Sequence, residues 1–185
     1  MQQGFLALDD PANAGDAALF AHVDWTRSVA YAIGLNGIYV NLEGRENGGI
    51  VPPAGKRLVL DQIAARLKEF TDPVSGEHIV SRVYLPETAF QGRNVKNSPD
   101  LFVGFRAGYR ASWQTALGAV PAAALEDNTD AWIGDHCIAS DEVPGVLLSN
   151  RKVRASTPQL FDITATILNE FGIAKTATMI GKSVY

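Results

Sequence analysis

The chain has 185 residues, of which 46% are hydrophobic and 19% are charged. Its mean hydropathy lies close to zero, and this profile is typical of an ordinary globular domain and excludes an intrinsically disordered chain. The formal net charge of −4 offers no broad electrostatic attraction for nucleic acid or for an anionic membrane surface, so we expect neither as a partner.

Cysteine usage and the N-terminal residues bear on the cellular compartment. A single cysteine, Cys137, excludes an intrachain disulfide. No run approaches the roughly 20 apolar residues that span a bilayer. The first residues lack the basic and apolar regions of a signal peptide. A cytoplasmic location follows by default, unless the true N-terminus and an export signal precede Met1, so we assign no location.

The N-terminal half alternates between strand-like and helical patterns. Residues 1–20 are rich in Ala, Asp and Gly and are expected to be irregular. Two strand-like runs, 27–34 and 37–42, flank an Asn-Gly step that favours a tight hairpin. From 56 to 70, apolar residues recur every three or four positions, which predicts an amphipathic helix.

The C-terminal half contains less regular patterning. Residues 78–85 and 101–105 are strand-like, and residues 143–148 are expected to form a buried strand. A Thr-Pro pair and an apolar face predict a last helix over 157–172. The stretch 107–142 shows little periodicity, and irregular segments of that length usually have a functional role or pack against something else. We therefore expect it to line a site or to contact a missing domain.

The interspersed strands and helices define the expected fold class. They predict an α/β fold, or an α+β fold, with a mixed and partly parallel sheet flanked by helices. No internal repeat or low-complexity linker divides the chain, so residues 1–185 are treated as a single unit. A smaller α/β subregion is expected as an insertion at residues 45–100.

Three histidines are the first candidates for metal chemistry. His22, His78 and His136 are more than 50 residues apart, so none forms a closely spaced metal motif with another. His78 lies in a strand-like run and is expected to serve structure. His136 stands between Asp135 and Cys137, and imidazole, carboxylate and thiolate groups are all zinc ligands. Consecutive residues rarely all face one ion, so a hydrogen-bonded loop histidine and a buried thiol remain the alternatives.

Other chemical signatures are weak. The sequence contains no phosphate-binding glycine loop with Lys and Ser or Thr, no dinucleotide-binding fingerprint after a strand and no Gly-x-Ser-x-Gly nucleophile turn. A loose acidic series is explained by solvent exposure without a function, and the scattered aromatic residues are assigned to packing by default. The series comprises Asp127, Asp130, Asp135 and Asp141.

Five segments carry a resemblance to a known family when they are taken in chain order. Together they resemble the type I phosphodiesterase/nucleotide pyrophosphatase branch of the alkaline phosphatase superfamily over about residues 22–184. The last helix usually has proline where Ala165 stands, a departure that does not touch the chemistry. The segments are Val23-Asp24-Trp25-Thr26-Arg27 with the run 30–46, Asp72-Pro73 through Gly76-Glu77, Ser98-Pro99-Asp100-Leu101, Gly134-Asp135-His136 with Val143-Pro144-Gly145-Val146-Leu147, and the run 162–168 with Gly181-Lys182-Ser183.

The resemblance implies a hydrolase with two zinc ions. In the family, a Thr or Ser nucleophile and most of the Asp and His ligands come from earlier in the chain, and the final metal ligand corresponds to His136. Asp135 would orient that imidazole from its other ring nitrogen. The nucleophile and the remaining ligands have no counterparts here and would lie before Met1, so no catalytic residue is assigned and the isolated chain is expected to be inactive.

Substrate and alternative functions follow from the same resemblance. The full-length protein would cleave a phosphate diester or a nucleotide, and nucleotide, phospholipid and phosphonate diesters all fit. An alternative is a stand-alone module that kept the fold, lost catalysis, and binds a partner or forms a homodimer. A third interpretation is a small metal site of Asp135, His136 and Cys137, shared between two chains.

Overall fold

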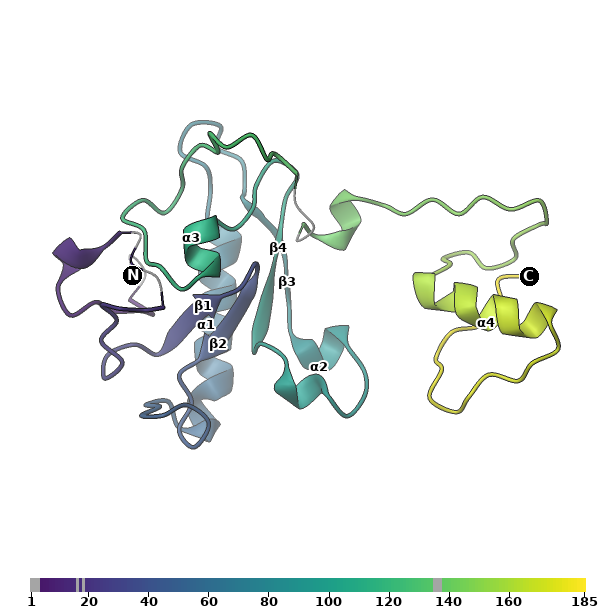
Figure 1. Cartoon of the computed structure of the whole chain (residues 1–185), viewed down its shortest axis with the longest axis horizontal. Helices are drawn as coiled ribbons and strands as arrows, with labels where there is room; N and C mark the ends of the chain where they lie inside the picture. The colour runs from purple at the N-terminus through teal and green to yellow at the C-terminus, as the bar shows by residue number, and fades with distance from the viewer. Residues whose placement is uncertain (1–3, 16, 18, 135–137) are drawn as a thin grey trace. The chain divides into compact units, whose positions relative to one another are not determined.

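The chain divides into two compact units in the computed structural model, which describes residues 4–15, 17, 19–134 and 138–185. The first unit is Met1–Pro144 and the second is Gly145–Tyr185. The first contains the sheet and the longest helix, and the second contains the last helix (Figure 1). None of the described helices is long and apolar enough to cross a membrane.

A four-stranded antiparallel sheet is the centre of the first unit. Its strands are β1 (Ala30–Ile33), β2 (Gly37–Val40), β3 (Val80–Tyr84) and β4 (Leu101–Phe105). They lie in the order β1-β2-β4-β3, and every neighbouring pair is antiparallel. The structure is therefore mixed α/β, as expected.

We expected a partly parallel sheet, and that expectation is wrong for these four strands. Parallel pairing among the described residues is limited to two isolated bridges, Leu42 with Val51 and Phe105 with Ile138. The connection from β1 to β2 is too short for a crossover, which a parallel pair requires. The expected subregion 45–100 supplies a helix and β3 to the same sheet rather than a sheet of its own.

The β1–β2 hairpin is confirmed, although the glycine with the left-handed backbone is not the one in the Asn-Gly step. The left-handed residue is Gly34, with φ of 76°. Gly37 already pairs with Ile33 in the ladder. A Cβ atom at Gly37 would lie 2.9 Å from Cγ of Pro99, so this glycine permits a close approach of the chain that leads into β4.

Helix α1 (Lys56–Glu69) confirms the helix expected at 56–70 and covers one face of the sheet (Figure 1). Its apolar positions Leu60 and Ile63 are buried. They pack in one cluster with Val40 of β2 and Leu101 of β4, both of which have no exposed surface. Burial of this face against the sheet stabilises a helix whose isolated form would be marginal.

The remaining elements of the first unit are short. They are the helices α2 (Pro86–Ala89) and α3 (Trp113–Ala116) and the 3-10 turns η1 (Pro11–Asn13), η2 (Pro53–Gly55), η3 (Val95–Asn97) and η4 (Ser140–Glu142). Within the described part of 107–142, only α3 and η4 are regular, which confirms the irregular stretch expected there.

The buried strand expected at 143–148 is wrong. No residue of that run is in a strand, and Val146 and Leu148 are 84% and 89% exposed. Pro144 has no backbone N–H to donate to a ladder, and Gly145 weakens a strand further. An apolar run therefore does not become a strand here.

The second unit is built on helix α4 (Leu160–Glu170). The helix begins later than the expected Thr-Pro cap, because the carboxylate of Asp162 accepts a hydrogen bond of 2.9 Å from the backbone N–H of Gln159. It ends as expected just before Gly172, whose φ is 66°. Asp162 also accepts from the backbone N–H of Lys182 at 2.8 Å, which ties the C-terminal tail to the helix.

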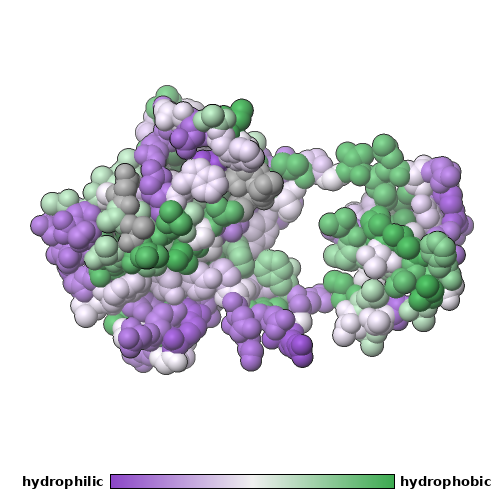
Figure 2. Space-filling model, viewed as in Figure 1, coloured by the Kyte–Doolittle hydropathy of each residue, from purple (hydrophilic) through white to green (hydrophobic). Residues whose placement is uncertain are grey.

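The second unit leaves most of its large apolar side chains in solvent (Figure 2). Its buried residues are few and small, among them Ala165 and Val184. By contrast, among its exposed large apolar side chains the exposed fraction ranges from 38% at Leu147 to 89% at Leu148, and 41 residues rarely bury enough area to be stable alone. The other exposed apolar residues include Ile167, Phe171, Ile173 and Ile180.

The core of the first unit gives a stability prediction. Replacing Leu101 with alanine removes a fully buried side chain and leaves a cavity, so we expect the free energy of unfolding to fall by about 2–5 kcal/mol. Leu58→Ala is the matched control, because Leu58 is 63% exposed on α1. Urea unfolding followed by circular dichroism measures both. Equal unfolding midpoints would contradict the packing described here.

Candidate functional site

The predicted metal residues Asp135, His136 and Cys137 lie outside the described residues. In the described part of the chain, no group of three or more His, Cys, Asp or Glu side chains is placed to hold a metal ion. His22 and His78 have other surroundings. The Nδ1 atom of His22 lies 3.7 Å from a carboxylate oxygen of Asp9, and His78 pairs with Thr71 in an isolated antiparallel bridge.

The segment that follows His136 in sequence is attached to the end of the sheet. Ala139 has no exposed surface, and its backbone N–H donates to the carbonyl of Phe105 at 2.9 Å. Arg82 of β3 forms an ion pair with Asp141. A hydrogen bond from Ser81 and one from the backbone N–H of Ala107 lower the pKa of Glu142. Strands β3 and β4 thus fix where the chain continues after the predicted ligand.

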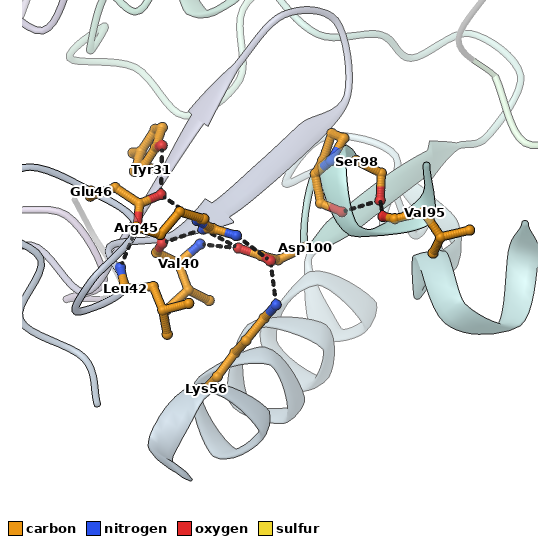
Figure 3. A network of polar contacts seen from close by, with 10 residues as sticks. Tyr31, Val40, Leu42, Arg45, Glu46, Lys56, Val95, Ser98 and Asp100 are labelled. Atoms are coloured by element: carbon orange, nitrogen blue, oxygen red, sulfur yellow. Dashed lines mark hydrogen bonds and ion pairs between the residues drawn. The ribbon is translucent and has the colours of Figure 1, made fainter. Parts of the chain in front are cut away.

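A carboxylate with almost no exposed surface organises the opposite end of β4. Asp100 is 3% exposed and accepts two hydrogen bonds from the guanidinium of Arg45, at 2.8 and 2.6 Å (Figure 3). Lys56 at the start of α1 approaches the same carboxylate at 2.6 Å. The backbone N–H of Val40 donates to it at 2.7 Å. Three other segments of the first unit therefore converge on one side chain.

A second carboxylate extends the network towards β1. Glu46 accepts from the backbone N–H of Leu42 at 2.8 Å and from Arg45 Nε at 2.8 Å (Figure 3). The Tyr31 hydroxyl donates to it at 3.1 Å. Burial and the negative charge of Glu46 raise the pKa of Tyr31 to about 12. The positive charges of Arg45 and Lys56 balance the two carboxylates. The network therefore holds the backbone in position and contains no group poised to act as an acid or a base.

The pKa of Asp100 reports the strength of these contacts. Burial alone raises the pKa of a carboxyl group, because it disfavours the charged form. Here the hydrogen bonds from Arg45, from Lys56 and from the backbone N–H of Val40 outweigh burial and hold the pKa of Asp100 below its ordinary value. The carboxylate is therefore a permanent negative charge in the folded protein at neutral pH.

A cavity of about 900 Å³ lies beside β1 and the C-terminal half of α1. Tyr31 and Ile63 line it from the strand and the helix, and Trp113 lines it from α3. Residues 119–130 complete the wall. The irregular stretch 107–142, expected to line a site or to contact a missing domain, lines this cavity with residues 110–115 and 119–130, and Tyr31 connects the cavity to the charged network.

Sequence reasoning missed the charged network, although Arg45, Glu46 and Asp100 lay in the segments singled out for their resemblance and only Lys56 lay outside them. Asp100 directly precedes the apolar run of β4, and a carboxylate at the edge of a buried strand is a signal for a paired charge. The partners Arg45 and Lys56 lie 55 and 44 positions earlier, and no local pattern identifies them.

The chain matches no family model, no curated protein and no solved structure. The resemblance to phosphodiesterases therefore rests on the residues of the sequence alone. Arg45, Asp100, Asp162 and Lys182, which all lie in the matched segments, hold distant parts of the chain together by the hydrogen bonds described above.

The charged network gives a pH-dependent stability prediction. Asp100→Asn leaves Arg45 and Lys56 without their counter-charge, and because both are about one-third exposed we expect a loss of about 3 kcal/mol, at the low end for buried pairs. Asp61→Asn breaks an exposed pair with Arg57 and should cost about 0.5 kcal/mol or less.

The sign of the pH effect follows from the lowered pKa of Asp100. A carboxyl group with a lower pKa in the folded state contributes full stability above its unfolded pKa of about 3.9 and loses it as the pH falls through the folded value. The unmodified chain should therefore lose more stability below about pH 4 than Asp100→Asn does. Urea unfolding at several pH values measures this difference. If the unfolding free energies of the two proteins fall equally as the pH is lowered, this role of Asp100 is contradicted.

Proposed function

We propose that the chain is the C-terminal portion of a zinc-dependent phosphodiesterase of the nucleotide pyrophosphatase type. Its contribution is the last metal-binding histidine, His136, with Asp135 orienting the imidazole from the other ring nitrogen. The observation that carries the proposal is the series of five segments in the family's order, the fourth of which contains Gly134-Asp135-His136.

Contacts between matched segments support the proposal. Arg45 and Asp100 belong to different matched segments and form a two-pronged ion pair across 55 positions of sequence. Asp162 and Lys182 belong to the two parts of the last segment and are joined by a hydrogen bond.

The chemistry of the proposed site requires more metal ligands than the described residues supply. Zinc, when bound, would polarise the phosphoryl oxygen and stabilise charge on the attacking and leaving oxygens. A catalytic zinc typically has three protein ligands, and the described residues contain no group that could provide them. The proposal therefore assigns the nucleophile and the other ligands to residues outside these 185, and the substrate to phosphate diesters, nucleotides included.

The first functional prediction concerns hydrolysis of bis(4-nitrophenyl) phosphate. With zinc, the 185-residue chain should show no turnover above its His136→Ala variant. A polypeptide that adds the upstream coding sequence should hydrolyse the diester, and there His136→Ala should lower the rate by about 10²-fold or more, while Asp135→Asn costs about 10- to 100-fold. Release of 4-nitrophenol measures the rate.

His78→Ala is the matched control for this assay, because His78 is an exposed histidine outside the proposed site. It should retain the full rate. Zinc-dependent turnover by the 185 residues alone, lost on His136→Ala, would show a complete site and overturn the division of ligands. If the His136→Ala variant of the extended polypeptide kept full activity, His136 would not be the metal ligand that we propose.

A second candidate function is a non-catalytic binding module that forms a homodimer. The observation that favours it is the apolar surface of the second unit, where Phe171 is 77% exposed and Leu160 is 88% exposed. Contiguous apolar surface of this kind usually marks an interaction site. On this candidate the surface is covered by a second copy of the chain.

Size-exclusion chromatography with light scattering tests the second candidate. A homodimer that dissociates on Phe171→Ser would support it, because the serine removes apolar area from the contact. Leu58→Ser, at a similarly exposed position of the first unit, should leave the dimer intact. A monodisperse monomer at all concentrations would count against the module.

A further inference from the structure

The cavity beside β1 and α1 has the size and the surface of a small-molecule site. Its volume of about 900 Å³ lies within the range of ligand pockets, about 300–1,000 Å³. The wall is mainly apolar, with Ile63 and Leu67 from α1 and the run 119–125 opposite. Neither the charged network nor the proposed metal residue accounts for this space.

Aromatic side chains form part of the cavity lining, and one face of Tyr31 is stacked on Tyr39. Phe20, Tyr31 and Trp113 line it, and Phe20 and Tyr31 meet edge to face with their ring centres 5.5 Å apart. Their rings carry negative potential on their faces. The guanidinium of Arg110, itself a lining residue, already lies 4.9 Å from the centre of the Trp113 ring. One wall of the cavity is therefore holding a cation against an aromatic face.

The charges around the cavity have an acidic excess. Four carboxylates line it, against the two guanidiniums of Arg66 and Arg110. Arg66 lies 3.3 Å from the carboxylate of Glu69, so that pair is neutral. Glu126, Asp127 and Asp130 remain and form no ion pair within the described residues. The local potential thus favours a positive ligand and disfavours an anionic one.

We propose that this cavity binds an organic cation with an apolar or aromatic body, of the quaternary or protonated amine class. The body occupies the apolar wall, the cationic head lies against the aromatic faces, and Asp127 and Asp130 add electrostatic attraction at solvent-exposed positions. Arg110 competes for the Trp113 face, because it is a cation that the chain itself supplies. This binding requires no zinc and is independent of the proposed hydrolase.

Isothermal titration calorimetry of the 185-residue chain in EDTA tests the proposal with three benzyl compounds. Benzyltrimethylammonium is a cation, benzyl alcohol is neutral and phenylacetate is an anion, while all three carry the same ring. We expect the cation to bind most tightly and the anion least tightly. Added salt should weaken binding of the cation, because the carboxylates are solvent-exposed.

Variants identify the groups responsible. Asp127→Asn, Asp130→Asn and Trp113→Ala should each weaken benzyltrimethylammonium binding by about two- to fivefold, the range of exposed charge and cation–π contacts. Arg110→Ala should tighten it by a similar factor, because the competing cation is gone. Asp61→Asn is the matched control, since Asp61 is an exposed carboxylate that pairs with Arg57 and does not line the cavity.

Three results would overturn the proposal. They are the absence of binding heat, equal affinity for benzyltrimethylammonium and benzyl alcohol, and effects of Asp127→Asn and Asp130→Asn no larger than that of Asp61→Asn. Arg110→Ala guards against loss of fold, because a gain in affinity cannot arise from unfolding. Since EDTA is present throughout, failure here leaves the hydrolase proposal untouched, and failure of the hydrolysis assay leaves this one untouched.

Discussion

The first unit depends on the pairing of one nearly buried carboxylate with two cations from distant segments. A charge removed from water costs several kcal/mol unless it is matched, and Asp100 is matched by Arg45, Lys56 and the backbone N–H of Val40. These contacts set the position of the loop after β2, the start of α1 and the beginning of β4 together. Apolar packing alone, which is not directional, would not fix that geometry.

The two ends of β4 have complementary roles. At its start, Asp100 gathers the charged network, and Glu46 carries it to Tyr31 at the cavity wall. At its end, Phe105 receives the segment that begins with Ile138, just after the predicted metal ligand. A five-residue strand therefore links the charged network at Asp100 to the bridge that Phe105 forms with Ile138.

Elements with strong local patterns could be predicted from the sequence, and long-range partners could not. Apolar residues at steps of three and four located α1, and a short apolar run located β4, because both signals reside within the element. The prediction of a strand at 143–148 was wrong because an apolar run indicates burial but does not identify a strand to pair with, and Pro144 opposes pairing. The irregular stretch before His136 lines a cavity, but Trp113 was assigned to packing by default, since an aromatic residue looks the same in a core and in a cavity.

The order in which the chain is synthesised gives the charged network a consequence for biogenesis. Arg45 and Lys56 leave the ribosome 44 or more residues before Asp100, which at about 5–20 residues per second is a delay of about 2–10 s. During that interval β2 and α1 exist without their counter-charge and without the central strand β4. The nascent sheet is then an unfinished edge on which Lys56 lacks its counter-charge and Arg45 is balanced only by Glu46.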